Sequence, residues 1–222
     1  MPALPRISSS PSVSWNLKRR WRKPLTHPEK TLRAFIAIET PRPMQEAIGR
    51  QTAALRQRLP APLVRWVPPE NIHLTLKFLG ETSITTLEQL VTLLRTAAEE
   101  HSPFELSAAG LGVFPNRAQP RVIWIGLTAP AALLALQRDI EGICARLGYS
   151  PEDRPFSPHL TIGRVNPRLN TEEKQRLRQA LEERQIGELG TIQVNAFHVF
   201  KSDLQPEGAV YTRLYTLPLK SL

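Results

Sequence analysis

The sequence predicts a mixed α+β fold in which most strands are antiparallel. Segments with the two-residue alternation of strands follow segments with helical periodicity in the order β-α-β-β-α-β-β-α-β-α-β-β. The 21 prolines among 222 residues argue against long uninterrupted helices and favour firm turns between short elements. A chain of this length can bury a core without disulfides or metals.

The first elements are three strands and a helix. The apolar run 33–39 predicts a buried strand, and two prolines then introduce a helix over 44–59, because proline is tolerated at a helix start. A short strand over 64–67 ends at a second pair of prolines. Strict alternation over 73–79 predicts the next strand, and Gly80 is expected to end it.

The middle of the chain predicts two more helices around a pair of strands. Helical periodicity covers 84–100 and 131–147, and a glycine follows the second segment. The strands are expected over 104–109 and 122–127. The residues between them, 110–120, are rich in glycine and proline and therefore indicate a loop.

The last part of the chain predicts a strand, a helix and two closing strands. The strand covers 159–165, and Asn170 or Thr171 is expected to cap a helix that continues to about residue 185. The segments 191–200 and 210–217 are expected to form the final strands.

The amino-terminal segment differs from the rest in charge and in hydrophobic pattern. Residues 1–30 contain seven basic residues and one acidic residue, which is +6 of the total charge of +9. We expect residues 1–31 to be a disordered basic tail or the product of a mis-assigned translation start, with a transit segment or an RNA-contacting arm as alternatives. Residues 32–222 are expected to form a single folded domain.

Composition excludes several classes of protein. No apolar run approaches the ~18 residues that a membrane-spanning helix needs, so we expect no membrane partner. Cys144 is the only cysteine, which excludes an intramolecular disulfide and a cysteine-based metal site. These features favour a cytoplasmic protein.

The most informative feature is a four-residue pattern that occurs on two predicted strands. HLTL occupies residues 73–76 and HLTI occupies residues 159–162, in a chain that has five histidines. Such a repeat arises by chance at roughly one in a thousand. On a strand, residues i and i+2 face the same side, so each motif presents one imidazole and one hydroxyl on one face and aliphatic side chains on the other.

Two facing motifs would place two imidazoles and two hydroxyls in one cleft. Histidines with a pKa of about 6.5 can supply one base and one acid at neutral pH. Attack of water on a phosphodiester needs such a pair, and it needs no metal. A zinc site has little support, since no third ligand has suitable spacing. The alternative is that both histidines are structural and are satisfied by local hydrogen bonds.

Several segments resemble the bacterial and archaeal RNA 2′,3′-cyclic phosphodiesterases. This family belongs to the two-histidine phosphoesterase superfamily and was once named 2′-5′ RNA ligases. The resemblance extends in order from about residue 33 to 219 and leaves residues 1–31 outside. The segments that carry it are 33–39, 64–80, 112–116, 121–126 and 155–164.

The resemblance implies a bilobal fold of two antiparallel sheets, with helices outside and the two motifs in a central cleft. It also implies that His73 is the general acid, which faces the leaving 3′ oxygen. His159 would be the general base, which faces the attacking water. Thr75 and Thr161 would bind the phosphate, and no cofactor or metal would be needed.

Two further residues of the family pattern lie five positions after the histidines. Arg164 matches an arginine that grips the phosphate, and Phe78 matches an aromatic residue that stacks on the terminal base. Strict alternation would put both on the opposite face from the histidines, so a bulge or twist near Gly163 and Gly80 must re-aim them. Alternation also places Lys77 on the face of the first histidine, where it would add positive charge.

The sequence therefore predicts an enzyme that hydrolyses RNA 2′,3′-cyclic phosphate ends to 2′-phosphates, and we expect it to be a monomer. The same chemistry could act on 2′-5′-linked oligonucleotides, small cyclic nucleotides or ADP-ribose cyclic phosphate. Microscopic reversibility would also permit 2′-5′ RNA ligation. A nucleotide- or RNA-binding module without turnover is the alternative from another class.

Overall fold

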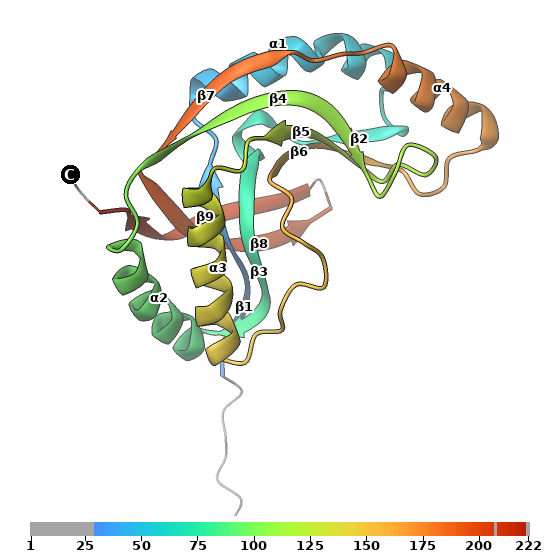
Figure 1. Cartoon of the computed structure of the whole chain (residues 1–222). Helices are drawn as coiled ribbons and strands as arrows, with labels where there is room; N and C mark the ends of the chain where they lie inside the picture. Colours follow the sequence, from blue (N-terminus) through green and yellow to red (C-terminus); the bar gives the residue numbers. More distant parts are fainter. Residues whose placement is uncertain (1–28, 207, 221–222) are drawn as a thin grey trace, which may run out of the picture.

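The computed structural model describes residues 29–206 and 208–220 and has an α+β fold (Figure 1). The expected order of elements is confirmed, with one additional strand. The strands are β1 (Thr31–Glu39), β2 (Val64–Trp66), β3 (His73–Ser83), β4 (Phe104–Phe114), β5 (Val122–Leu127), β6 (His159–Val165), β7 (Glu188–Val194), β8 (Ala196–Gln205) and β9 (Gly208–Pro218). The helices are α1 (Arg42–Arg58), α2 (Ile84–Ala98), α3 (Ala131–Arg146) and α4 (Thr171–Glu182), with a 3-10 turn, η1, at Pro69–Asn71.

The strands of the described residues form one curled sheet of two halves. The order is β7-β4-β5-β6-β3-β1-β8-β9, all neighbouring pairs are antiparallel, and β2 pairs with β6. The halves meet where β3 pairs with β6, and the only Cα partners there are Leu74 and Leu160. The two expected sheets are therefore joined by a single residue pair, which lies inside the two histidine motifs.

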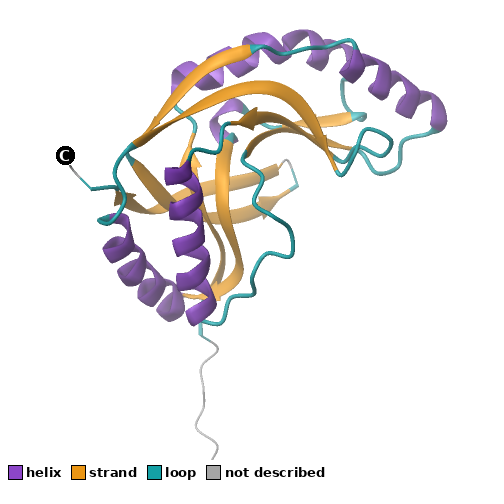
Figure 2. Cartoon of the chain, in the orientation of Figure 1, coloured by secondary structure: helices purple, strands orange, loops and turns teal. Residues whose placement is uncertain are grey.

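Helices cover the outside of both halves, as predicted. Helices α2 and α3 pack together and against β3, while α1 contacts α4 and β7 (Figure 2). Each half of the sheet thus has its own pair of helices, and the opposite face stays open for polar side chains.

The helix boundaries follow from the capping residues. Ser83 accepts a hydrogen bond from the Thr86 amide at 3.1 Å and begins α2. Asn170 and Glu173 form a reciprocal capping box at the start of α4, so Asn170 is the N-cap. Pro41 precedes α1 and has an extended backbone, as a helix N-cap requires.

Three predicted strand boundaries are wrong. Strand β3 continues through Gly80, which adopts a φ of 69°, and ends at Ser83. Strand β4 extends to Phe114, because β5 pairs with residues that the glycines had suggested to be a loop. The segment 191–200 is split at Asn195 into the ends of two strands: β7 pairs with β4 in one half, whereas β8 pairs with β1 in the other.

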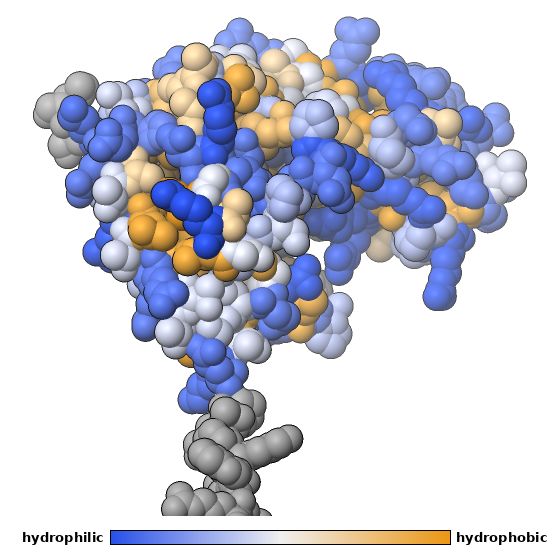
Figure 3. Space-filling model, turned by 60° about the horizontal axis from the view of Figure 1, so that its bottom comes forward, coloured by the Kyte–Doolittle hydropathy of each residue, from blue (hydrophilic) through white to orange (hydrophobic). Residues whose placement is uncertain are grey.

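The hydrophobic core lies between the sheet and the helices. Leu74, Leu76, Leu160 and Ile162 are buried in it, which confirms that the aliphatic face of both motifs belongs to the core. The molecular face in Figure 3 is mainly hydrophilic, with small separate hydrophobic patches. No helix of the described residues has both the length and the apolar character needed to cross a membrane. The predicted tail falls almost wholly on residues 1–28, outside the described residues.

Candidate active site

The two motif strands have the same local structure. Strands β3 and β6 both begin at the motif histidine, and their first seven residues share one pattern of burial. In each, the histidine and the threonine are half-buried, while the two aliphatic residues are buried. Because the strands pair at Leu74 and Leu160, the structure brings the two predicted polar faces together.

A bulge at the same position of each strand re-aims the residue five places after the histidine. The pairing of β3 with β1 skips Leu76, and the pairing of β6 with β5 skips Ile162. One extra residue in a strand reverses the alternation beyond it. Phe78 and Arg164 therefore return to the face of the histidines, whereas the sequence suggested only that some bulge was needed.

Phe78 lies on the cleft side of β3 and is not part of the core. Its side chain is 58% exposed, and its ring centroid lies 6.4 Å from that of Phe35. The Phe35 ring in turn stacks on His73 at 4.8 Å. An exposed aromatic ring beside a buried aromatic cluster provides a surface on which a planar ligand can stack.

The expectation for Lys77 is wrong. Its side chain is 2% exposed, and its Nζ donates to Glu141 Oε2 at 2.8 Å and to the Ser150 carbonyl at 2.7 Å. The bulge that brings Phe78 into the cleft turns Lys77 away from it. This lysine ties β3 to α3 and to the loop after α3, and it cannot reach a phosphate in the cleft.

Both histidines are oriented by the carbonyl group two residues earlier in the chain. The distance is 2.9 Å from His73 Nδ1 to the Asn71 oxygen and 2.7 Å from His159 Nδ1 to the Ser157 oxygen. A carbonyl oxygen can only accept, so Nδ1 carries the proton and donates it. In the neutral ring Nε2 is then free to act as a base.

Aromatic side chains hold each imidazole on a second side. Tyr211 and His73 form a T-shaped pair with ring centroids 5.2 Å apart, and Phe114 and His159 form another at 5.0 Å. The Trp124 ring lies 6.2 Å from His159. Sequence reasoning did not single out Tyr211, Phe114 or Phe35 for this site, since an aromatic residue on a strand usually indicates core packing.

Burial and positive charge determine the pKa values of the two histidines. Burial lowers the pKa of His73 to about 4, helped by Arg164 and His159 and opposed by the bond to Asn71. Burial, with a smaller effect of Arg164, also lowers the pKa of His159. Both rings are therefore neutral at pH 7 in the ligand-free protein. A bound anion would raise both pKa values, because opposite charge favours the protonated form.

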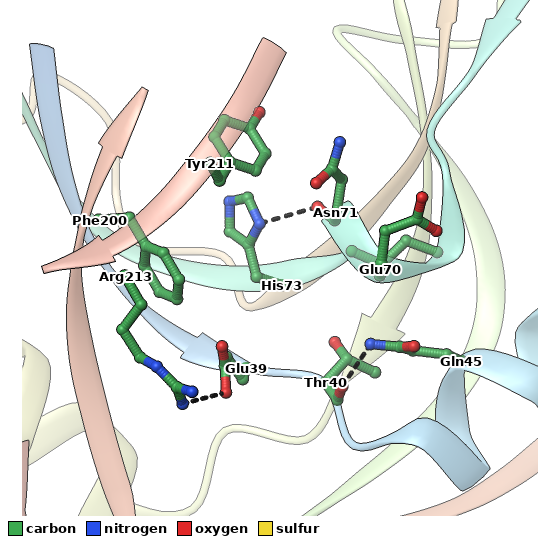
Figure 4. Close-up of a pocket in the computed structure, with 10 residues that line it drawn as sticks. Glu39, Thr40, Gln45, Glu70, Asn71, His73, Phe200, Tyr211 and Arg213 are labelled. Carbon is green, nitrogen blue, oxygen red and sulfur yellow. Dashed lines mark hydrogen bonds and ion pairs between the residues drawn. The ribbon is translucent and has the colours of Figure 1, made fainter. Parts of the chain in front are cut away.

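A cavity of about 250 Å³ lies beside His73 and is lined by no residue of β6 (Figure 4). It is formed by the end of β1, the turn η1 and the strands β8 and β9. Figure 4 shows the His73 ring at its edge, with the hydrogen bond to Asn71. Of the described residues, no group of three His, Cys, Asp or Glu side chains is placed to hold a metal ion.

Comparison with known families agrees with the doubled site. The model of the family described as LigT-like phosphoesterase matches residues 38–124 and again residues 125–211. Each match contains one of the two histidine motifs. The chain therefore contains an internal duplication. It is seen both in the two matches to one family model and in the two bulged strands.

Whole-length relatives support the same conclusion. An RNA 2′,3′-cyclic phosphodiesterase of Methanothermobacter thermautotrophicus is 34% identical over 181 residues, which is 82% of this chain and 95% of the relative. An RNA 2′,3′-cyclic phosphodiesterase of Archaeoglobus fulgidus is 32% identical over 183 residues, which is 82% of this chain and 98% of the relative.

Solved structures agree in fold as well. A crystal structure of a Thermus thermophilus protein has a TM-score of 0.69 at 27% identity, covering 85% of this chain and 98% of that one. Escherichia coli LigT in complex with 3′-AMP has a TM-score of 0.66 at 26% identity, and the match covers 86% of this chain and 100% of LigT. A twofold family match, a shared fold and two intact motifs on paired strands place this chain in the family of LigT-like phosphoesterases.

Proposed function

We propose that this enzyme hydrolyses the 2′,3′-cyclic phosphate at RNA ends to a 2′-phosphate by acid–base catalysis without a metal ion. The names of its relatives support the substrate class. The observation that carries the proposal is the pair of imidazoles. In each, the Nδ1–H group donates a hydrogen bond to a carbonyl, and Nε2 remains available for proton transfer.

The proposed reaction has two proton transfers, and each histidine carries out one of them. His159 Nε2 accepts a proton from the water that attacks phosphorus. The bond from phosphorus to the 3′ oxygen breaks, and protonated His73 donates its Nε2 proton to that oxygen. The phosphate remains on the 2′ oxygen, and proton exchange with solvent restores both rings.

The remaining cleft residues would bind the substrate. Thr75 and Thr161 share the faces of the histidines, so their hydroxyls are suited to donate to the non-bridging phosphate oxygens. Arg164 is exposed on the same face, and its planar guanidinium matches two phosphate oxygens. Phe78 would stack on the terminal base. The bound 3′-AMP of Escherichia coli LigT supports a nucleotide site of this kind.

The two halves of the chain would act together. Because each half contributes one histidine, we propose that residues 32–222 function as one unit. The cytoplasmic location and the monomeric state stay predictions from the sequence.

The proposal is tested by removing each imidazole separately. His73→Ala and His159→Ala should each lower kcat by ~10²–10⁴-fold on RNA with a cyclic phosphate end, with the melting temperature kept within a few degrees. His101→Ala is the matched control, because His101 pairs with Asp139 after the end of α2. Full activity in either cleft variant would refute the assigned roles.

A further inference from the structure

The cavity beside His73 has the features of a binding site that the proposed reaction does not use. The catalytic chemistry needs the face shared by His73 and His159, whereas this cavity is lined by His73 and by no residue of the second motif (Figure 4). Polar side chains line most of it. They are Glu39, Thr40, Gln45, Glu70, Asn71 and Arg213.

Thr40 lines the cavity and has a hydroxyl whose hydrogen bonds are not satisfied by other described residues. The residue is 4% exposed, and its hydroxyl has no hydrogen-bond partner within the described part of the chain. A buried hydroxyl without a partner costs about 1–3 kcal/mol, so native proteins rarely retain one without a use. Beside it, Gln45 donates Nε2 to the Thr40 carbonyl at 2.8 Å, which fixes the orientation of the amide.

The charges of the cavity exclude a phosphate and favour a neutral ring. Glu39 pairs with Arg213 at 3.0 Å, and its carboxylate also lies 3.8 Å from His198 Nε2. Glu70 adds a second carboxylate at the rim. Carboxylates repel phosphate but accept hydrogen bonds from amino groups. The ligand should therefore be an uncharged heterocycle that presents N–H donors.

Aromatic side chains provide an apolar wall for such a ring. Tyr211 and Phe200 line the cavity, and both belong to the aromatic cluster around His73. The volume of about 250 Å³ is sufficient for one base. A polar edge opposite an aromatic wall is the usual arrangement for recognition of an unstacked nucleobase.

We propose that this cavity binds the base of the nucleotide that precedes the cyclic-phosphate end, and that it prefers bases with an amino group over uracil. The inference rests on the proposed function, in which His73 faces the 3′ oxygen of the terminal ribose. The RNA strand continues from that ribose, and the cavity shares the His73 ring with the cleft. Guanine, adenine and cytosine offer amino donors to Glu39 and Thr40, whereas uracil offers mainly carbonyl acceptors.

The kinetic test compares dinucleotides that differ only in the first base. GpU, ApU, CpU and UpU, each with a terminal 2′,3′-cyclic phosphate, are compared with cyclic uridine phosphate alone. The kcat/KM of the three amino-bearing dinucleotides should exceed that of the UpU substrate by about tenfold. Thr40→Val should reduce this ratio severalfold, and Glu39→Gln should shift the preference toward uracil because its amide can donate. Arg42→Ala, an exposed residue paired with Glu46 outside the cavity, is the matched control.

A binding measurement separates this proposal from the proposed function. Equilibrium titration with the product-like GpU and UpU 2′-phosphates needs no turnover. Tighter binding of the guanine ligand, lost in Thr40→Val, supports the cavity even if no hydrolysis is found. Equal affinity for the two ligands would overturn the proposal. It would also fail if Thr40→Val weakened the mononucleotide as much as the dinucleotides, because the cavity would then hold the terminal base.

Discussion

The Nδ1 hydrogen bonds to the Asn71 and Ser157 carbonyls define the chemistry available at the two histidines. A carbonyl fixes the tautomer as a carboxylate would, but it does not raise the basicity of the ring by a full negative charge. The imidazoles therefore keep the low pKa values that burial imposes. His73 must nevertheless be protonated to act as the general acid. In the proposed complex the negative phosphate beside it favours that protonated form.

The pH dependence should reveal this coupling between substrate and His73. In the free enzyme the pKa of His73 is about 4, and a bound phosphate should raise it. Activity falls as the general acid loses its proton, so the alkaline limb of kcat should lie at higher pH than that of kcat/KM. Rate profiles on a cyclic-phosphate substrate measure both limbs. Coincident limbs would mean that the phosphate does not act on the acid.

Phe78 should contribute to binding and not to stability. Loss of one base–aromatic stack costs ~1–3 kcal/mol, so Phe78→Ala should raise KM about tenfold or more with little change in kcat. The melting temperature should stay unchanged, because the ring is 58% exposed. Leu93→Ala, which removes another exposed apolar side chain on α2, should leave KM as it is. A large loss of stability in Phe78→Ala would instead place the ring in the core.

At the scale of elements, the two bulged strands show what sequence could and could not predict. Alternation correctly placed both histidines and both threonines on a polar face and the aliphatic residues in the core. It failed beyond the third residue after each histidine, where Leu76 and Ile162 are skipped in the pairing. A bulge depends on the partner strand, so a single strand's sequence does not specify it.

The predicted segment 191–200 shows the same limit for a whole strand. It contains no glycine or proline, but β7 and β8 pair with different halves of the sheet. Propensity identifies extended chain, whereas the choice of neighbour is made by tertiary packing. The cavity near Thr40 likewise could not be predicted from the sequence, because strands from both ends of the chain form it.

The buried Lys77 of β3 is paired with Glu141 of α3, so the stability of the protein should depend on keeping both charges. Glu141→Ala should lower the free energy of unfolding by about 3 kcal/mol, because it leaves the buried Lys77 ammonium with the Ser150 carbonyl and only a distant carboxylate, Glu152 at 3.9 Å. The double variant Lys77→Met, Glu141→Leu should recover most of this loss. Urea unfolding measures both. Equal destabilisation by the single and double variants would show that the charge is not the cause.

At the scale of the whole molecule, the cleft is made by the contact between two halves. Each half has its own helices, and the sheet passes from one to the other through Leu74 and Leu160 alone. One internal duplication accounts for three observations. They are the matched bulges, the matched hydrogen bonds of the histidines and the twofold family match. The duplicated strands bring one histidine from each half to the same place because they pair side by side in the sheet.

The low pKa of His73 should also make global stability depend on pH. The unfolded ring takes up a proton near pH 6.5, whereas the folded ring resists it down to about 4. The stabilisation is therefore present above the unfolded pKa and is lost as pH falls toward the folded pKa. Between about pH 7 and pH 5 the wild type should lose more stability than His73→Asn, measured by thermal unfolding. Identical losses would contradict the burial of a neutral ring.

The most direct test of the central claim is the identity of the reaction product. The protein is incubated, with EDTA present, with a short RNA that ends in a 2′,3′-cyclic phosphate, and the terminal phosphate is located. We expect a 2′-phosphate, which would establish the reaction, its independence of divalent metal and the donation of a proton to the 3′ oxygen. A 3′-phosphate would contradict the roles assigned to His73 and His159, and the absence of any product would contradict the proposed activity itself.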